Sequence, residues 1–422
     1  MSRTATHILF IAEFSTGGSI ESLLCLVGGL DKQAFRATVL FYTMPEDAIR
    51  TRLESAGATV VSLYPRGSDK GVRKHHTKYD MQTRIRGFGG RQVERWYESF
   101  KFAVRFLRLR RPIYKAILAR ILEIRPDLVH LNNGVVSDMP GIWAARAGRV
   151  PMVCHIRTFS KLTYLSIKAA RSVDRFVCIS RAVRDVLTDY GIDTERCVVI
   201  PNAVDLQRFD ESEISTTGIR EEFGWDESHK LFALVGRVVS WKGQDYFIEA
   251  IAEARESDPS IRGLIVGNGE GSPGSDRFAD SLRLLIKKHD LEKFVRFTGH
   301  RTDIPNIMKA ADAVICASSL PEPFGRVIIE SMAVGTPAVA TNAGGAADII
   351  SDGTDGLLVP IKDSKALAQA MLRLSRDDAL VQELRLAAMQ TVAERYTVKQ
   401  HVSRVCGVYH TLLDSQQTDS SK

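Results

Sequence analysis

The sequence predicts an α/β protein with two doubly wound units, each a parallel sheet covered by helices on both faces. Short apolar runs alternate with helix-like segments in the first half of the chain, and the alternation starts again after Pro201. The length of 422 residues suits two or three domains, at about 100–200 residues per domain. Apolar strands that alternate with helices are typical of a parallel sheet buried on both faces.

In the first half, the elements are predicted from apolar periodicity and from the glycines that end helices. Strands are expected at 7–14, 36–43, 58–64, 127–133, 150–157, 174–180 and 197–205. Helices are expected at 15–30, 46–57, 139–148 and 181–191. Turn residues and polar composition at 201–225 suggest a linker between the two units.

The second half repeats the pattern and closes with a long helical segment. Strands are expected at 230–239, 262–269, 295–300, 313–318 and 337–345, and helices at 243–256, 280–292 and 304–312. Residues 366–414 are helical throughout by composition, and the polar tail 415–422 is predicted to be disordered. We place the N-terminal domain at 1–205, the C-terminal domain at 206–394 and a last helix with its tail at 395–422.

Composition and charge bound the class of protein. Apolar residues make up 44% and charged residues 25%, which is ordinary for a globular chain. No apolar run is long enough for a transmembrane helix, and the run at 8–12 is too short for a signal peptide. The cysteines form no CxxC pair, and we expect buried free thiols in a cytoplasmic protein. They are Cys25, Cys154, Cys178, Cys197, Cys316 and Cys406.

Ligands of open parallel sheets bind outside the carboxyl ends of the strands, so residues just after strands are candidates for a site. Arg237 follows the apolar run "LFALVG" at 231–236 and Lys242 lies in the loop behind it, flanked by Gly236 and Gly243. Two cations beside glycines suit a diphosphate, because the backbone can approach the anion while the cations neutralise it. A solvated surface pair is the alternative.

The stretch "SSLPEPFGRVIIESMAVGTP" at 318–337 holds two acids, Glu322 and Glu330, eight positions apart. The prolines on both sides of Glu322 keep it extended. A helix is predicted from about Phe324–Gly325 to Ala333, with its first N–H groups free to bind an anion. A carboxylate at Glu330, among apolar residues, suits a ribose diol; a structural ion pair or a solvated helix face is the alternative.

Three weaker candidates also follow strands. Gly17 and Gly18 allow close approach of a phosphate or form a plain turn. His155 ends the stretch "VPMVCH" at 150–155, where it is a site residue or a satisfied structural histidine. The "VGNGE" segment, with Gly267, Asn268 and Gly269, passes backbone along a nucleobase or sugar, or is only a loop. No GxGxxG follows the first strand, and no GxxxxGK[ST], HExxH, GxSxG or DxD occurs, which disfavours metal-dependent transfer through a DxD site.

Together these motifs resemble glycosyltransferase family 4. The resemblance covers nearly the whole chain and rests on "EPFGRVIIESMAVGTPAVATNAGG", "DGTDGLLVP", "GRVVSWKG", "VGNGE", "TGHRTDIPNIMKAADAVICAS", "IPNAVD" and the N-terminal "GG". It implies the GT-B fold, two Rossmann-like domains facing a central cleft, with the last helix crossing back to the N-terminal domain. The chain departs from the family pattern at Asp348, where a glutamate is usual.

The resemblance also implies roles for the candidates. Arg237 and Lys242 would bind the donor diphosphate, Glu322 the donor sugar, and Glu330 the ribose. His155 would lie near the sugar and the acceptor. Further donor contacts are implied for Gly17, Gly18, Gly236, Gly267, Asn268, Gly269, Phe324, Gly325, Arg326 and Val327.

We therefore predict a retaining, metal-independent glycosyltransferase without a cofactor. Its donor would be a UDP- or GDP-linked sugar, and its acceptor a hydroxyl of a glycan or lipid-linked molecule in surface polysaccharide, lipopolysaccharide or glycolipid synthesis. Attack from the face of the leaving group is the favoured mechanism, and double displacement through Glu322 is the runner-up. A sugar-nucleotide epimerase and a non-catalytic sugar-nucleotide binding protein are the alternative functions.

One segment carries the positive charge. Residues 65–125 hold 17 Lys and Arg against five Asp and Glu, a local net charge of +12 in a chain of net charge +7. Its end, 101–126, interleaves apolar and basic residues, which suits an anionic membrane surface. We predict a cytoplasmic protein, peripheral on the inner face of the membrane. A core-packing helix with a solvated basic face is the alternative, and nucleic acid is not expected.

Overall fold

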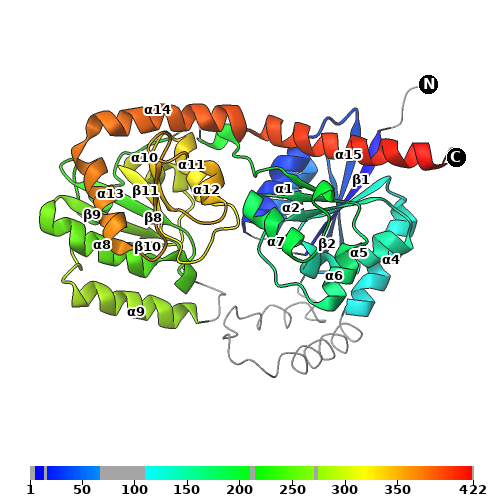
Figure 1. The fold of residues 1–422 in the computed structure, drawn as a ribbon, viewed down its shortest axis with the longest axis horizontal. Helices are drawn as coiled ribbons and strands as arrows, with labels where there is room; N and C mark the ends of the chain where they lie inside the picture. The colour runs from blue at the N-terminus through cyan, green and yellow to red at the C-terminus, as the bar shows by residue number, and fades with distance from the viewer. Residues whose placement is uncertain (1–4, 14–16, 67–109, 210–213, 270–273, 421–422) are drawn as a thin grey trace. The chain divides into compact units, whose positions relative to one another are not determined.

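The computed structural model describes residues 5–13, 17–66, 110–209, 214–269 and 274–420. Contacts divide the chain into two compact units (Figure 1). Unit 1 comprises residues 1–201 together with 401–422, and unit 2 comprises residues 202–400.

Within the described residues, unit 1 contains a seven-stranded parallel sheet in the order β3-β2-β1-β4-β5-β6-β7. The strands are β1 Thr6–Ala12, β2 Phe35–Thr43, β3 Thr59–Tyr64, β4 Leu128–Leu131, β5 Met152–Ile156, β6 Arg175–Cys178 and β7 Cys197–Val199. The central strands are mostly apolar because helices cover both faces; five residues of β1, from Ile8 to Ala12, are fully buried.

The helices of unit 1 precede and follow these strands along the chain. They are α1 Gly18–Gly28, α2 Asp47–Ser55, α4 Arg111–Ile124, α5 Val135–Ala147, α6 Tyr164–Ala170, α7 Arg181–Asp189 and α15 Val398–Ser420, with the 3-10 turn η3 Thr194–Arg196. The last helix begins at the boundary of unit 2, and its part from His401 onward belongs to unit 1. It continues to Ser420, so the prediction of disorder from residue 415 was wrong for the backbone up to that residue.

Helix α5 begins four residues before the predicted start at 139. Pro140, the second residue of the predicted helix, lies well inside the observed helix. Proline has no N–H to donate to the carbonyl of Val136, one turn earlier. The Arg110 guanidinium donates to that carbonyl instead. A side chain from the preceding segment thus compensates for the missing backbone hydrogen bond.

Within the described residues, unit 2 contains a six-stranded parallel sheet in the order β10-β9-β8-β11-β12-β13. The strands are β8 Lys230–Val235, β9 Ile261–Val266, β10 Val295–Gly299, β11 Ala313–Cys316, β12 Ala338–Thr341 and β13 Leu357–Val359. The sequence therefore predicted the fold class correctly, as two doubly wound parallel sheets.

Helices and 3-10 turns complete unit 2. They are α8 Gln244–Ser257, α9 Ser275–Lys288, α10 Ile304–Ala310, α11 Arg326–Ala333, α12 Ala346–Ile349, α13 Ser364–Arg376 and α14 Asp378–Arg395, with η4 Leu206–Phe209, η6 Glu221–Phe223 and η7 Ser240–Lys242. Helices α8, α9 and α13 bury one face of the sheet, whereas Ile219, Trp225 and α10 contribute to a second apolar cluster.

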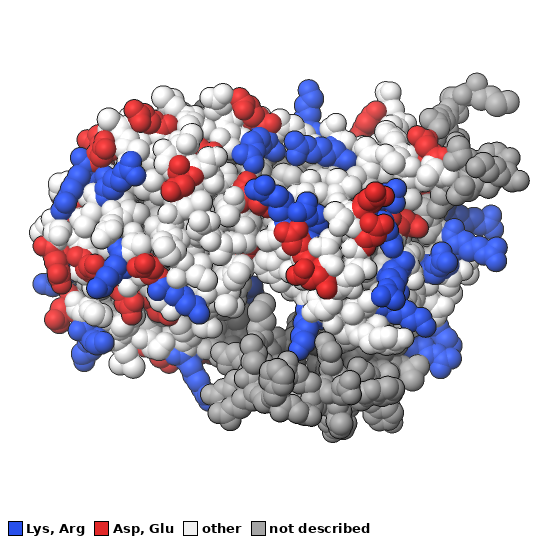
Figure 2. Space-filling view, in the orientation of Figure 1, with Lys and Arg blue, Asp and Glu red and all other residues white. Residues whose placement is uncertain are grey.

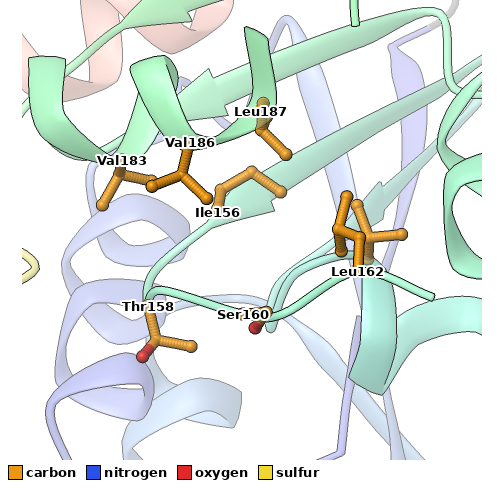
Figure 3. Close-up of a pocket in the computed structure, with 8 residues that line it drawn as sticks. Ile156, Thr158, Ser160, Leu162, Val183, Val186 and Leu187 are labelled. Carbon is orange, nitrogen blue, oxygen red and sulfur yellow. The ribbon is translucent and has the colours of Figure 1, made fainter. Parts of the chain in front are cut away.

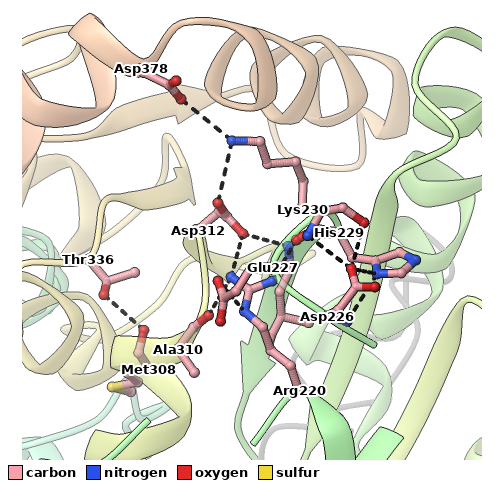
Figure 4. A network of polar contacts seen from close by, with 12 residues as sticks. Arg220, Asp226, Glu227, His229, Lys230, Met308, Ala310, Asp312, Thr336 and Asp378 are labelled. Carbon is pink, nitrogen blue, oxygen red and sulfur yellow. Dashed lines mark hydrogen bonds and ion pairs between the residues drawn. The ribbon is translucent and has the colours of Figure 1, made fainter. Parts of the chain in front are cut away.

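The predicted linker at 201–225 is wrong for its last part, which packs into unit 2. Trp225 is 5% exposed and Arg220 is 9% exposed. The Arg220 guanidinium donates to the carbonyls of His229 and Ala310 and lies 3.1 Å from Asp312 Oδ2 (Figure 4). Polar composition suggested a linker, but these polar groups are held by hydrogen bonds inside the unit.

Each sheet has one point where the order of strands reverses, which is where open α/β sheets bind ligands. In unit 1 the point lies between β1 and β4, and in unit 2 it lies between β8 and β11. Among the residues that the structure describes, none of the helices combines the length and the apolar character that crossing a bilayer requires.

Candidate active site

The loops after β8, β9 and β11 approach each other closely at the reversal point of unit 2. Gly243 has φ +74°, and an added Cβ there would lie 1.8 Å from the carbonyl oxygen of Ala317, just after β11. An added Cβ on Gly267 would lie 2.2 Å from the carbonyl oxygen of Gly236, just after β8. Glycine is required at both positions, because any side chain would push the loops apart.

Glu322 lies in this cluster of loops and is 4% exposed. One carboxylate oxygen, Oε1, accepts a hydrogen bond from the Ser318 hydroxyl at 2.6 Å and forms an ion pair with Lys242 Nζ. The residue bridges to Gly344 as a strand residue does, which confirms the extended conformation predicted from Pro321 and Pro323. A buried carboxylate is tolerated here because charge and hydrogen bonds compensate its loss of water.

The backbone of Glu322 rests on two glycines that follow β12. The N–H of Gly345 donates to the Glu322 carbonyl at 2.7 Å. An added Cβ on Gly344 would lie 2.1 Å from that same carbonyl oxygen, and one on Gly345 would lie 2.4 Å from the Cα of Phe324. Sequence reasoning quoted this double glycine without assigning it a role, although a glycine pair after a strand is a signal of close backbone approach.

The structure separates the two predicted diphosphate cations. Arg237 is exposed after β8, and none of the described residues forms an ion pair with its guanidinium. Lys242, in contrast, pairs with Glu322 and lies 4.4 Å from the centre of the Trp241 ring. The alternative of a solvated pair is therefore wrong for Lys242, and only Arg237 is open to an incoming anion without losing a protein partner.

Helix α11 begins at Arg326, with Gly325 at φ +99° before it, close to the predicted start. Phe324 is buried at 3% exposure, and its ring contacts that of Tyr396 edge-on. Glu330 is 19% exposed, and its Oε1 accepts from Arg326 at 2.9 Å, one turn earlier. The structural ion pair that was the alternative for Glu330 is thus present, and it leaves the second carboxylate oxygen without a described partner.

The "VGNGE" segment follows β9 and is described as far as Gly269. The carbonyl of Asn268 accepts from the N–H of Val238 at 2.9 Å, and the N–H of Gly267 donates to the carbonyl of Gly299. An added Cβ on Gly269 would lie 2.3 Å from the Cβ of Ser275. These glycines hold the loop of Arg237 against the first turn of α9.

In unit 1, Gly17 and Gly18 begin helix α1 beside the end of β1. Gly17 has φ +85° and no atom within 4 Å of an added Cβ, so its conformation rather than space requires glycine. Both glycines are exposed. They are consistent with the predicted backbone contact, which stays a prediction.

The turn after β4 accepts hydrogen bonds from the side chain of Arg157, a residue that follows β5. The Arg157 guanidinium donates to the Asn132 side-chain oxygen at 2.8 Å and to the Asn132 carbonyl at 3.0 Å. Asp138 Oδ2 accepts from the N–H groups of Asn133 and Gly134 at 2.6 and 2.9 Å and so supports the same turn. Sequence reasoning did not identify Asn132, because an asparagine after a strand gives no distinctive pattern.

His155 does not reach a surface in this structure, contrary to the predicted contact with the sugar. It lies inside β5 and is 0% exposed, with its ring 5.4 Å from that of His130 and 6.0 Å from that of His401. Burial, and then the neighbouring Arg157 guanidinium, hold the pKa of His155 well below its ordinary value, so the ring is neutral. His155 is therefore a buried histidine, but not the satisfied one of the alternative, because its Nε2 has no hydrogen-bond partner among the described residues.

A small pocket lies near the end of β5 (Figure 3). Its walls are mostly apolar, and the hydroxyl groups of Thr158 and Ser160 are its polar components. The other lining residues are Val135, Ile156, Leu162, Val183, Val186 and Leu187. The loop after His155 thus borders an apolar pocket of unit 1.

Two family models match the chain. Residues 25–208 match "Glycosyltransferase Family 4", and residues 215–391 match "Glycosyl transferases group 1". A D-inositol 3-phosphate glycosyltransferase from Corynebacterium urealyticum is 32% identical over 313 residues, which cover 68% of this chain and 72% of the relative. The chain belongs to glycosyltransferase family 4.

Other relatives of this glycosyltransferase act on different acceptors. A UDP-Gal:alpha-D-GlcNAc-diphosphoundecaprenol alpha-1,3-galactosyltransferase from Escherichia coli is 27% identical over 300 residues, which cover 67% of this chain and 75% of the relative. A phosphatidyl-myo-inositol mannosyltransferase from Mycobacterium leprae is 29% identical over 298 residues, which cover 68% of this chain and 74% of the relative.

Solved structures show the same fold. Anabaena Alr3699/HepE in complex with UDP has a TM-score of 0.75 at 22% identity, with 96% of this chain and 100% of that chain covered. A glycosyltransferase from Rickettsia africae has a TM-score of 0.78 at 19% identity, with 97% and 99% covered. The enzyme therefore has the GT-B fold, as its motifs implied.

Proposed function

We propose that this glycosyltransferase moves a sugar from a UDP- or GDP-linked donor to a hydroxyl of a glycan or lipid-linked acceptor. The transfer retains the anomeric configuration and needs neither a metal ion nor a cofactor. The observation that carries the proposal is that Arg237 follows β8 and Glu322 follows β11, the strands on the two sides of the reversal point of the unit 2 sheet.

The electrostatics of this cluster suit a nucleotide sugar. Arg237 supplies an exposed positive charge after β8, and α11 begins at Arg326, four residues after Glu322, so its first N–H groups lie close in sequence to that carboxylate. One carboxylate oxygen of Glu322 pairs with Lys242, and one of Glu330 pairs with Arg326. Their second oxygens can accept hydrogen bonds from sugar and ribose hydroxyls, the donors that carboxylates bind well.

The reaction follows from where charge develops. As the bond between C1 and the phosphate oxygen breaks, negative charge grows on the diphosphate and positive charge on the sugar ring. Arg237 stabilises the first, and the carboxylate of Glu322 stabilises the second. The acceptor oxygen bonds to C1 from the face that the phosphate leaves, and its proton passes to the leaving phosphate oxygen.

Double displacement is the alternative mechanism. Glu322 would then bond to C1 and be released by the acceptor in a second step. Oε1 of Glu322 is occupied by Lys242 and Ser318, so a nucleophilic attack would use Oε2. Mass spectrometry of the enzyme with donor alone distinguishes the two mechanisms, because only double displacement gives a glycosylated Glu322 peptide.

The names of the relatives support the class of acceptor. The galactosyltransferase from Escherichia coli and the mannosyltransferase from Mycobacterium leprae are both named for lipid acceptors. We propose a lipid-linked or glycan acceptor in surface polysaccharide, lipopolysaccharide or glycolipid synthesis, with the enzyme peripheral on the inner face of the membrane through residues 65–125. Residues 67–109 of that segment lie outside the described residues.

The test begins with thermal shift against UDP, GDP and their sugars, followed by transfer assays with the donor that stabilises the enzyme. Arg237→Ala is expected to lower kcat by two orders of magnitude or more, since the removal of one group that stabilises developing charge costs about 10²–10³. Arg277→Ala, an exposed arginine on α9, is the control. Transfer by Arg237→Ala at the rate of the control would contradict the proposal.

Retention and metal independence are tested separately. Proton NMR of the product at early time points should show the anomeric configuration of the donor. Activity should persist in excess EDTA. An inverted product, or activity that EDTA abolishes and Mg²⁺ restores, would overturn the corresponding part of the proposal without affecting the donor assignment.

A further inference from the structure

The surroundings of Ser318 suggest a role that the family motifs do not assign. Ser318 is 0% exposed and follows β11. Its hydroxyl lies 2.6 Å from Glu322 Oε1, four residues further along the chain. In a buried position a hydroxyl aimed at a carboxylate forms a short, charge-assisted hydrogen bond, which fixes the direction of the carboxylate.

The backbone around Ser318 is held from two sides. The Thr341 hydroxyl, at the end of β12, donates to the Ser318 carbonyl at 3.0 Å. The N–H of Ser319 donates to the Trp241 carbonyl at 2.9 Å, and Gly243 lets this loop approach Ala317. Ser318 therefore occupies a fixed point from which its hydroxyl can orient a neighbour.

Both protein partners of Glu322 bind the same oxygen. Ser318 and Lys242 converge on Oε1, and the Cys316 thiol lies 4.0 Å from that atom. Burial, followed by the charge of Glu322, raises the pKa of Cys316 to about 12, so the thiol stays neutral. Oε2 has no partner among the described residues and is not one of the enclosed polar atoms. The carboxylate thus offers one defined oxygen to a ligand.

We propose that Ser318 is a positioning residue for the transfer step. Its hydroxyl holds Oε1 of Glu322 so that Oε2 faces the hydroxyls of the donor sugar. Lys242 has a positive charge that a bound diphosphate also attracts. When the ammonium group turns toward the phosphates, the Ser318 hydroxyl remains as the side-chain anchor of the carboxylate. This inference rests on the proposed function, because it needs a sugar donor in the unit 2 site.

The test compares Ser318→Ala with Ser331→Ala. Ser331 is also 0% exposed and hydrogen-bonded, but its hydroxyl donates to the Thr336 carbonyl at 2.7 Å and does not contact Glu322. For each variant we would measure kcat with the accepted nucleotide sugar, and Kd for the matching nucleoside diphosphate by calorimetry. The diphosphate lacks the sugar, so its affinity reports on the rest of the site.

Ser318→Ala is expected to lower kcat about tenfold, the equivalent of about 1.4 kcal/mol, while Kd for the diphosphate stays within twofold of wild type. Ser331→Ala should leave both values unchanged. A kcat for Ser318→Ala within twofold of wild type, or a parallel loss of diphosphate affinity, would overturn the positioning role. Absence of transfer by the wild-type enzyme with every donor would instead contradict the proposed function.

Discussion

At the scale of single residues, the two acids of the motif differ in what holds them. Glu322 is buried and bound by a lysine from η7 and a serine from its own loop, whereas Glu330 is bound by an arginine one turn earlier in α11. Two carboxylates at this spacing first suggest an acid–base pair. In the proposed function, Glu322 instead binds the sugar of the donor and Glu330 binds its ribose.

These two proposed roles predict different effects of replacing Glu322 and Glu330. Glu330→Ala should weaken nucleoside diphosphate binding about tenfold or more and leave kcat at saturating donor within threefold, because it removes a contact made equally before and during transfer. Glu322→Ala should lower kcat at least tenfold with little change in diphosphate affinity. Calorimetry and initial rates measure the two effects, and equal effects of both variants on both quantities would contradict the assignment.

A second prediction concerns the glycine beneath Glu322. Gly344→Ala should abolish most transfer, since its Cβ would lie 2.1 Å from the Glu322 carbonyl oxygen. Gly353→Ala is the matched control, because Gly353 has a similar φ of +72° but no atom within 4 Å of an added Cβ. Both variants should lose about 1–2 kcal/mol of stability from the left-handed backbone. Equal activities of the two variants would show that the contact with Glu322 is unimportant.

Side-chain partners were the part of the site that sequence could not predict. The positions of Arg237, Glu322 and Glu330 after strands or in a helix follow from the order of the elements. That Lys242 bonds Glu322, and that His155 is enclosed, depends on how loops from distant strands pack. A single sequence shows how far apart residues lie along the chain, but not which side chains touch. For each of these residues a functional and a structural interpretation were therefore both possible from the sequence.

At the scale of elements, helix α15 is attached to the unit 1 sheet by buried polar groups. The Tyr409 hydroxyl lies 2.7 Å from His130 Nδ1, and His401 Nδ1 lies 2.7 Å from the Pro201 carbonyl oxygen. The Nε2 atoms of His130 and His155 are buried without a described hydrogen-bond partner. Burial first, and then the Arg157 charge, holds the pKa of both rings well below the ordinary value.

The burial of these two histidines predicts that the folded protein loses stability at acidic pH. Their folded pKa values are lowered, so the unfolded chain binds more protons below about pH 6.5 and stability falls as pH decreases. Each contributes up to about 1.4 kcal/mol per pH unit in that range. His155→Leu should reduce the slope of unfolding free energy against pH between 6.5 and 5, measured by denaturant titration. Replacement of the exposed His300 by Gln should leave it unchanged, and equal slopes would disprove the explanation.

The contacts of helix α4 bear on the two interpretations of the basic segment, a membrane contact or packing in the core. Ile113, Ile117 and Ile121 form its buried stripe, and α4 packs against α5. The core-packing alternative is therefore correct for this described part of the basic segment. A membrane contact of α4 would therefore use its exposed face, which carries Arg111 and Lys115. The interleaving of apolar and basic residues predicted an amphipathic segment, but this pattern does not say whether protein or lipid covers the apolar side chains.

At the scale of the whole molecule, charge is uneven. Figure 2 shows Lys and Arg side chains over the part of unit 1 where Figure 1 draws α4. Outside residues 65–125 the chain has a net charge of −5, given +12 within the segment and +7 overall. An anionic surface would therefore attract residues 65–125 more strongly than the rest of the chain.

This asymmetry predicts salt-dependent binding to anionic vesicles. The full chain should sediment with phosphatidylglycerol vesicles at low salt, bind less at 0.5 M NaCl, and not bind neutral phosphatidylcholine, since charges near such a surface contribute about 1 kcal/mol each. Arg111→Ser with Lys115→Ser should weaken binding severalfold. The control is Lys287→Ser with Lys288→Ser on α9. Lack of binding to the anionic vesicles would remove the membrane proposal.

The fold itself was readable from the sequence because strand–helix alternation and glycine positions are local signals. The errors arose where tertiary contacts outweigh composition. The composition around residues 219–225 suggested a linker, but Arg220 donates to the carbonyl of Ala310 and holds this segment within unit 2. The helix that contains Pro140 starts earlier than predicted, and Arg110 donates to the carbonyl of Val136 that the proline leaves without a partner. In both cases an arginine side chain donates to a backbone carbonyl far away in sequence, Ala310 for Arg220 and Val136 for Arg110.

The path of the chain through unit 1 has a consequence for its synthesis. The chain leaves this unit after Pro201 and re-enters it at His401, so α15 is translated only after all of unit 2. Until then Phe35 and His130 lack the ring of Tyr409, which lies against both in the finished protein. A ribosome-bound chain thus exposes an incomplete apolar surface while it makes some 200 further residues. Unit 2, which is continuous in sequence, can fold first, although it is made second.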